Sequence, residues 1–161
     1  MTTQLSASIH FTARPAQILA MLCDESYLKA KAADSTESSF AVKRDANQVS
    51  VSLTRVWPKE LPEPAARLMG KTVTVTEVQH WDTSNPDLAR ATFDITFGNA
   101  PVKIKGTMQL VATQGGTDVL IDGEARVAVP IFGKSAESMI VSELVNVMER
   151  ERAIGQTWLN S

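Results

Sequence analysis

SAESMIVSELVNVMERERAIGQTWL, residues 135–159, is the stretch that decides the fold. Its apolar side chains recur with the period of an α-helix and share one face of a helical wheel: Ala136, Ile140, Leu144, Val147, Ile154 and Trp158, with Met148 on the border. The pattern predicts a helix of about 24 residues, which would be about 36 Å long at about 1.5 Å per residue. A helix with an apolar face of that length needs an equally long apolar surface to pack against.

The chain before this helix has the alternation of β-strands, interrupted once by two short helices. Leu5, Ala7, Ile9 and Phe11 alternate with polar residues and predict the first strand. The first short helix begins near Pro15, which suits a first helical turn, and the second covers residues 25–33. About six further strands follow, around residues 40–42, 49–53, 73–81, 91–97, 102–110 and 119–129, with turn signals between them.

This order of elements predicts an α+β fold. Consecutive strands joined by short turns pair in an antiparallel meander. A sheet that is apolar on one face must cover that face, and the C-terminal helix is the element long enough to do so. The sequence therefore predicts a helix-grip fold over residues 1–161 as one domain: a curved antiparallel sheet of about six to seven strands around a long C-terminal helix, with two short helices after the first strand.

Composition narrows the classes of partner. Hydrophobic residues make up 43% of the 161 residues and the net charge is −2, so the broad basic surface typical of proteins that bind nucleic acid or anionic membranes is not expected. No apolar run is long enough to span a bilayer, and no signal peptide is evident, so stable membrane insertion is not expected. A single cysteine, Cys23, allows no intrachain disulfide, and a cytoplasmic location is the expectation. The Cys, His, Asp and Glu residues have no metal-ligand spacing, so neither a metal nor a cofactor is expected.

A set of scattered residues carries a resemblance to known proteins. They are Leu61-Pro62, Arg67-Leu68-Met69-Gly70, Gly98-Asn99-Ala100-Pro101-Val102, Gly106, the run from Val129 to Lys134, Glu137 and Trp158-Leu159. With the order of elements, they resemble the START-like superfamily, also called SRPBCC or polyketide cyclase and lipid-transport, and within it a bacterial family of unassigned function. The resemblance implies a cavity between sheet and long helix that holds lipids, sterols, polyketides or other apolar molecules. One departure is Arg14, which stands where relatives often have a helix-capping residue, so Thr12 is the expected cap.

Four polar side chains are predicted to face this cavity. Glu151 lies near the centre of the apolar face of the long helix, where a carboxylate must be paired, protonated or hydrated. Arg55, Glu77 and Gln79 share the parity of the apolar residues on their strands, so strict alternation points them inward, and Arg55 could pair with Glu77 or Glu151. Two alternatives remain: the helix end projects into water with Glu151, or one β-bulge exposes the strand residues and turns Val78 inward.

The predicted ligand-binding residues combine these polar groups with an apolar lining. The polar anchors are Arg55, Glu77, Gln79 and Glu151, and the lining is Leu53, Phe93, Ile95, Met108, Ile121, Ile140, Leu144 and Val147. Gly123 also has inward parity, and it either leaves room for a ligand or lets the helix approach closely. Residues 57–70 form the only long connection between strands, and they act either as a lid over the cavity or as a wide connection with a few apolar anchors.

Three functions agree with this pattern. The first is non-enzymatic binding of a hydrophobic or amphipathic small molecule, lipid-like or polyketide-like, with no catalytic residue. The second is a cyclase or hydro-lyase in the same cavity, in which Glu77 or Glu151 would be the acid or base. The third is an interaction module whose cavity has collapsed. An internal volume of hundreds of Å³ favours the first two, whereas water-sized voids favour the third.

Overall fold

The computed structural model describes residues 2–57, 60–61, 63, 65–129 and 133–161. Within this part of the chain, seven strands form one antiparallel sheet in the order β1-β7-β6-β5-β4-β3-β2. The elements are β1 (Thr3–Phe11), α1 (Pro15–Leu22), α2 (Glu25–Lys31), β2 (Ser38–Asp45), β3 (Gln48–Val56), α3 (Ala65–Met69), β4 (Thr74–Asp82), the 3₁₀ turn η1 (Pro86–Leu88), β5 (Arg90–Phe97), β6 (Val102–Thr113), β7 (Gly116–Val127) and α4 (Gly133–Leu159). The predicted α+β fold is confirmed.

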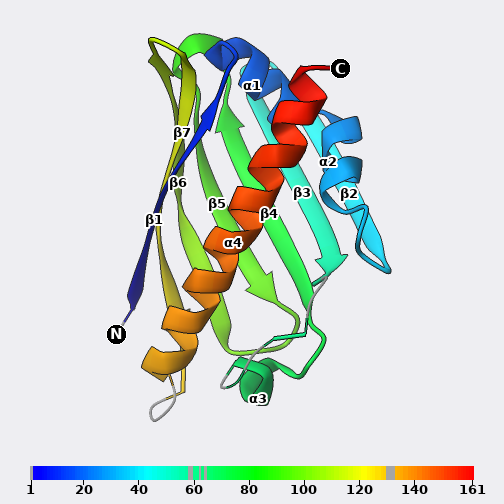
Figure 1. The fold of residues 1–161 in the computed structure, drawn as a ribbon, viewed down its shortest axis with the longest axis vertical. Coiled ribbons are helices and arrows are strands. Elements are labelled where there is room, and N and C mark those ends of the chain that lie inside the picture. Colours follow the sequence, from blue (N-terminus) through cyan, green and yellow to red (C-terminus); the bar gives the residue numbers. More distant parts are fainter. Residues whose placement is uncertain (1, 58–59, 62, 64, 130–132) are drawn as a thin grey trace.

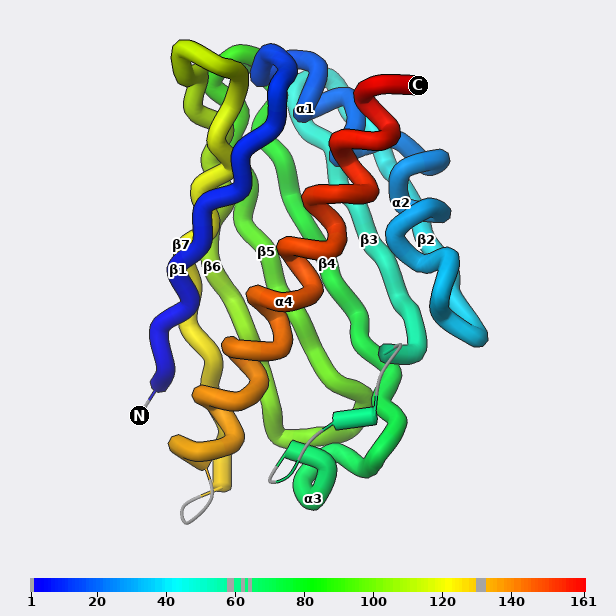
Figure 2. The backbone as a smooth tube through the Cα atoms, viewed as in Figure 1, coloured from blue at the N-terminus to red at the C-terminus, as the bar shows by residue number. Residues whose placement is uncertain are grey.

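The long helix lies across the concave face of the sheet (Figure 1). It runs diagonally from the lower end of β7 to the upper end, where α1 and α2 lie beside it (Figure 2). The strands from β2 to β7 are a simple meander, and β1 then pairs with β7, so that the first strand of the chain lies beside the last. Among the described helices, none is both long and apolar enough to cross a membrane.

The predicted apolar face of α4 is confirmed, but the helix starts earlier than expected. Ile140, Leu144 and Val147 are buried against the sheet. The described helix begins at Gly133, two residues before the predicted stretch, and the Gly133 N–H donates to the Val129 carbonyl oxygen at 3.0 Å. Sequence patterns place helix ends less reliably than helix faces, since the capping geometry is not visible in the periodicity.

Glu137 ties the beginning of α4 to the sheet. Its carboxylate accepts the Val127 backbone N–H at 2.9 Å and the Thr3 hydroxyl at 2.9 Å, and only 1% of the residue is exposed. The carboxylate thereby provides an acceptor for a backbone donor at the end of β7 and joins β1, β7 and α4 in one place. Burial of this charge is compensated by both hydrogen bonds, which fixes where the helix starts across the sheet.

The last turns of α4 approach the first elements of the chain closely. A Cβ atom at Gly155 would lie 2.7 Å from Cε1 of Phe11 on β1 and 3.1 Å from Cε of Met21 on α1. Glycine at this position therefore lets the helix backbone sit directly on these two side chains. This contact, with the helix–sheet packing below it, sets the height of α4 above the sheet.

The first short helix is capped differently from the prediction. The side-chain oxygen of Gln17 accepts the Arg14 backbone N–H at 3.1 Å, so the helix supplies its own capping group from its first turn. The Thr12 backbone N–H instead donates to the side chain of Gln156 on α4 at 3.1 Å. The expected role of Thr12 as the cap of α1 was therefore wrong.

Two glycines face each other in the pairing of β6 with β7. Gly106 pairs with Gly123, and a Cβ at Gly106 would lie 2.1 Å from the Asp122 carbonyl oxygen. A Cβ at Gly123 would lie 2.6 Å from the Lys105 carbonyl oxygen and 3.1 Å from the ring of Phe93. The prediction that Gly123 leaves room for a ligand or lets the helix approach was therefore wrong. The backbone of β6 and the Phe93 ring occupy that space.

Candidate functional site

A cavity lies on the concave side of the sheet, between α4 and the elements α1, α2 and β1. Its volume is about 60 Å³. Aliphatic and aromatic side chains form most of its wall: Ile9, Phe11, Leu22, Tyr27, Phe93, Ile95, Met108, Val119, Ile121 and Met148. The polar side chains in the wall are Lys31, Glu77, Gln79, Glu151 and Arg152. At about 15 Å³ for each water, the cavity has room for about four water molecules.

Four charged side chains from four elements meet at the polar side of the cavity. This charged cluster consists of Lys31 of α2, Arg55 of β3, Glu77 of β4 and Glu151 of α4. Nη2 of Arg55 lies 2.5 Å from Oε1 of Glu151, and Nζ of Lys31 lies 3.6 Å from Oε2 of the same carboxylate. Nζ of Lys31 also lies 3.3 Å from Oε1 of Glu77. Two cations and two carboxylates make the cluster electrically neutral, and it joins α2 and α4 to the sheet.

The side chains of the charged cluster are largely withdrawn from water. The exposed fractions are 5% for Lys31, 10% for Arg55, 15% for Glu151 and 24% for Glu77. Burial alone would lower the pKa of Lys31, but the carboxylates of Glu151 and Glu77 outweigh it and raise this pKa above its ordinary value. Burial alone would raise the pKa of Glu77, but Lys31 and Arg55 outweigh it and lower this pKa. Lys31 and Glu77 therefore both stay charged at neutral pH.

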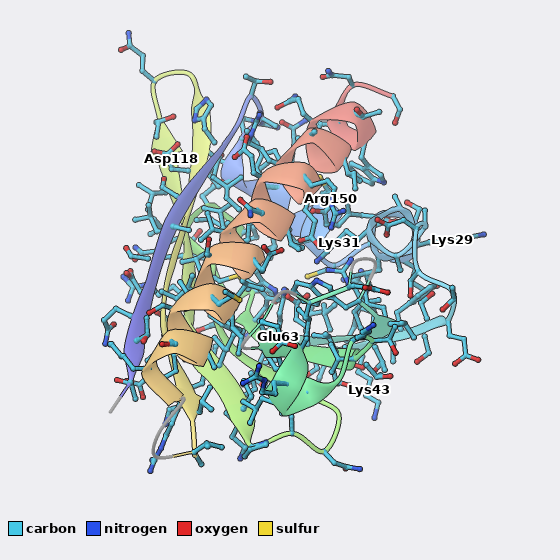
Figure 3. All side chains as sticks on the ribbon, turned by 60° about the horizontal axis from the view of Figure 1, so that its bottom comes forward. Lys29, Lys31, Lys43, Glu63, Asp118 and Arg150 are labelled. Carbon is cyan, nitrogen blue, oxygen red and sulfur yellow. The ribbon has the colours of Figure 1, made fainter. Side chains whose placement is uncertain are left out.

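Lys31 is the functional candidate that the sequence prediction missed. Figure 3 shows its side chain directed from α2 toward α4, whereas Lys29 points away from the molecule. Its Nζ also lies 5.5 Å from the centre of the Tyr27 ring, and a second link comes from Arg55, whose Nη1 donates to the Lys31 carbonyl oxygen at 2.7 Å. Helical spacing carried a signal: Lys31 follows the buried Tyr27 and Leu28 by four and three residues, so it shares their face.

Seven of the predicted ligand-binding residues line this cavity. They are Glu77, Gln79, Phe93, Ile95, Met108, Ile121 and Glu151. The inward parity of Glu77 and Gln79 is confirmed, and the alternative with a β-bulge is wrong, because β4 pairs in unbroken register with both neighbours. Glu151 is held by Arg55 rather than projecting into water, so the alternative for the helix end is also wrong.

Five predicted residues are buried but do not line the cavity: Leu53, Arg55, Ile140, Leu144 and Val147. Arg55 belongs to the charged cluster and contacts two residues of the cavity wall, Glu151 and Lys31. Ile140, Leu144 and Val147 belong to the turns of α4 before Met148, which is the first residue of the helix in the cavity wall. Periodicity identified the buried face of α4, but it could not show which part of that face is filled by the sheet.

The long connection at 57–70 does not cover the cavity. None of its described residues lies in the cavity wall, whereas Leu61 and Ala65 are buried as anchors. The short helix α3 contacts α4 and lies at the end of the sheet opposite to α2 (Figure 2). The prediction of a lid was therefore wrong for the described part of this segment, and Pro58, Pro62 and Pro64 lie outside the described residues.

The charged cluster predicts a pH dependence of stability. Because the pKa of Glu77 is below its ordinary value of 4.5, its stabilisation is present above about pH 4.5 and is lost as the pH falls through the folded-state value. Because the pKa of Lys31 is above its ordinary value of 10.5, its stabilisation is complete below that pH and is lost only as the pH rises through the folded-state value.

Urea unfolding measured from about pH 3 to about pH 8 tests the acid side of this dependence. The Glu77→Gln variant should lose less stability on acidification than the unmodified protein, since it has no ionised group to protonate at this position. Equal acid slopes in the two proteins would contradict the assigned interaction of Glu77 with Lys31.

Several solved structures share this architecture. The protein TTHA0849 from Thermus thermophilus is similar, with a TM-score of 0.64 and 18% identity, over 96% of this chain and 98% of that one. Zhui aromatase/cyclase from Streptomyces sp. R1128 has a TM-score of 0.53 and 13% identity, over 98% and 89%. Ara h 8.0201 has a TM-score of 0.58 and 10% identity, over 98% and 99%. At these identities the likeness shows the fold alone.

Sequence comparison gives a family rather than an activity. No curated protein sequence matches the chain significantly. A family model described as "Protein of unknown function (DUF2505)" matches residues 6–159, which is nearly the whole chain. The chain therefore belongs to the DUF2505 family.

Proposed function

We propose that this chain is a START-like binding protein that holds an apolar or amphipathic small molecule between the sheet and α4. The observation that carries the proposal is a mostly apolar cavity with a few convergent polar groups at one side, the usual composition of a small-molecule site. A lipid-like or polyketide-like molecule would place its carbon skeleton against Phe93, Ile95, Met108 and Ile121. Its polar end would lie at Gln79 and the charged cluster.

The charged cluster supports a role in binding. A buried network of ion pairs is on average no more stabilising than apolar residues of the same volume, because both ions must be removed from water. Apolar residues at the positions of Lys31 and Glu151 would therefore stabilise the fold equally well. Their position in the wall of the cavity supports polar recognition of a ligand as the reason for retaining them.

The small volume supports a second candidate, an interaction module with a collapsed cavity. A volume of about 60 Å³ is well below the several hundred Å³ of typical small-molecule pockets. Under the binding proposal, the cavity must enlarge when a ligand enters. Met148 and Arg152 of α4 are suited to this, since both are long, unbranched side chains that can swing outward without moving the helix.

Acid–base catalysis is a weaker candidate for the same cavity. A general acid at neutral pH needs a raised pKa, whereas the two cations of the cluster lower the pKa of Glu77. Glu151 is paired with Arg55 at 2.5 Å and faces Lys31 with its other oxygen. Both carboxylates are thus engaged with cations, which supports a binding role for the cluster over proton transfer.

Binding of 2-isopropenylnaphthalene, an uncharged apolar probe, tests the proposal. We expect saturable binding by isothermal titration calorimetry, with NMR shift changes at the methyl groups of Ile95, Met108 and Ile121. The Val119→Phe variant should lose at least about tenfold in affinity, because the added ring fills space in the cavity wall. Native mass spectrometry of gently purified protein should also reveal any copurifying molecule.

Leu120→Phe is the matched control, since Leu120 is adjacent on β7 but has the opposite parity and lies outside the cavity wall. This variant should bind the probe like the unmodified protein. Absence of binding by every apolar probe, together with a clean apo mass, would reject the binding proposal and support the interaction module.

A further inference from the structure

We infer that the ligand presents a neutral hydrogen-bond-accepting oxygen, the carbonyl of a ketone or ester, to the side-chain amide of Gln79. This inference rests on the proposed binding function and names the chemical class of molecule that the cavity selects. It follows from the direction in which the Gln79 amide is held, from the absence of a partner for its donors among the described residues, and from the charge around it.

A buried tryptophan fixes the direction of the Gln79 amide. The Trp81 indole Nε1 donates to Oε1 of Gln79 at 2.9 Å, and Trp81 is only 1% exposed. An indole N–H can donate but cannot accept, so the atom that it contacts must be the amide oxygen. The NH₂ group is therefore on the other arm of the amide, and rotation of the amide would leave the buried indole N–H without an acceptor.

The donors of that NH₂ group face the cavity. Gln79 is 6% exposed and lies in the cavity wall, and within the described part of the chain its Nε2 donates to no other residue. No described side-chain nitrogen or oxygen that is fully shielded from solvent is left without a partner, so Nε2 reaches the open space of the cavity. A buried amide that is held by one atom and free at the other offers two directed N–H donors to whatever enters.

The surrounding charges favour a neutral acceptor over an anion. Glu77 and Glu151 lie in the same wall, and their cationic partners Lys31 and Arg55 already balance them. A ligand carboxylate would add an uncompensated negative charge beside two carboxylates in a largely buried site. Arg152 is the remaining cation in the wall, but its exposed side chain pairs with Glu149 at 2.7 Å. A carbonyl oxygen can accept from Gln79 without this electrostatic cost.

The apolar wall explains why the remainder of the ligand should carry few polar groups. On β4 and β5, Gln79 pairs directly with Phe93, and Ile95 and Met108 lie farther along the same wall. Apart from Gln79, the uncharged polar group in the wall is the Tyr27 hydroxyl, which makes no hydrogen bond within the described residues. Two neutral polar groups on an apolar wall suit a carbon skeleton with one or two carbonyl oxygens.

Three naphthalene probes of nearly equal shape test this inference by calorimetry. They are 2-acetylnaphthalene, a ketone, 2-isopropenylnaphthalene, its hydrocarbon counterpart, and 2-naphthoate, a carboxylate. We expect the ketone to bind about three- to tenfold more tightly than the hydrocarbon, as one net hydrogen bond provides, and the carboxylate to bind most weakly. In the Gln79→Met variant, ketone and hydrocarbon should bind equally, because methionine keeps the length of the side chain and removes the donors.

A measurement on the unmodified protein does not depend on the variant folding. The side-chain amide protons of Gln79 should shift in the ¹⁵N–¹H NMR spectrum when the ketone binds. The carbonyl stretch of the bound ketone should lie at lower wavenumber than that of the same ketone in an apolar solvent, where it accepts no hydrogen bond. Equal binding of the three probes, or tightest binding of 2-naphthoate, would overturn the inference while leaving the proposed function in place. Absence of binding by all three would instead reject the proposed function.

Discussion

Replacing Glu151 by glutamine is expected to lower the free energy of unfolding by about 3 kcal/mol, as is typical when one partner of a buried ion pair is removed. Arg55 and Lys31 would then share the single carboxylate of Glu77, which contacts Lys31 but does not contact Arg55. The guanidinium of Arg55, with only 10% of its side chain exposed, would remain charged and unbalanced. Urea unfolding at neutral pH measures the loss directly.

Glu149→Gln provides the matched control on the same helix. Glu149 pairs with Arg152 at 2.7 Å, but both side chains are exposed, so we expect a change below about 1 kcal/mol. Replacing Arg55 and Glu151 together by methionine should recover most of the stability lost in Glu151→Gln, because no unpaired charge remains. If Glu149→Gln and Glu151→Gln were equally harmless, the cluster would not be a buried electrostatic contact.

Gly106→Ala is expected to have the larger effect and to cost about 3 kcal/mol or more, with failure to fold as its upper limit. The added Cβ would lie 2.1 Å from the Asp122 carbonyl oxygen and 2.6 Å from Cα of Gly123. Both contacts are with backbone atoms of β7, so relief requires the two strands to separate rather than a side chain to rotate. Soluble yield and urea unfolding measure the outcome.

Gly115→Ala separates this steric effect from the general effect of replacing glycine in the same hairpin. A Cβ at Gly115 would meet only the His10 ring, at 3.8 Å, which is ordinary van der Waals contact. Its stability should change by less than about 0.5 kcal/mol. A stable, well-folded Gly106→Ala protein would show that β6 and β7 are farther apart than the structure places them.

The sequence was sufficient for the architecture because the relevant signals are local and repeated. Alternation with period two identified the strands, and the helical period from Ala136 to Trp158 identified the long helix and its buried face. The same alternation correctly placed Glu77 and Gln79 on the concave face, since β4 continues without a bulge. Polar residues at inward-facing strand positions, where apolar residues are expected, thus predicted part of the site from sequence alone.

The remaining features depend on contacts between distant segments, which periodicity does not encode. The cavity wall includes Ile9 of β1, Leu22 of α1 and Lys31 of α2, because these elements fold back beside the end of α4. Sequence patterns also could not give the cavity volume, which depends on how the side chains of these separate elements pack together. The hydrogen bond that orients Gln79 joins it to Trp81, the next residue on the same face of β4. Its formation depends on the rotamers of both side chains, which the sequence pattern does not specify.

The pairing of β1 with β7 has a consequence for biosynthesis. Thr3 faces Ala125 and Phe11 faces Thr117, so each of these residues of β1 pairs with a residue that is synthesised more than a hundred positions later. The cavity forms later still, when α4 packs on the sheet and Glu151 pairs with Arg55. Contacts of such long sequence separation make folding comparatively slow, and slow folding prolongs the time for which the apolar face of the sheet is exposed to aggregation.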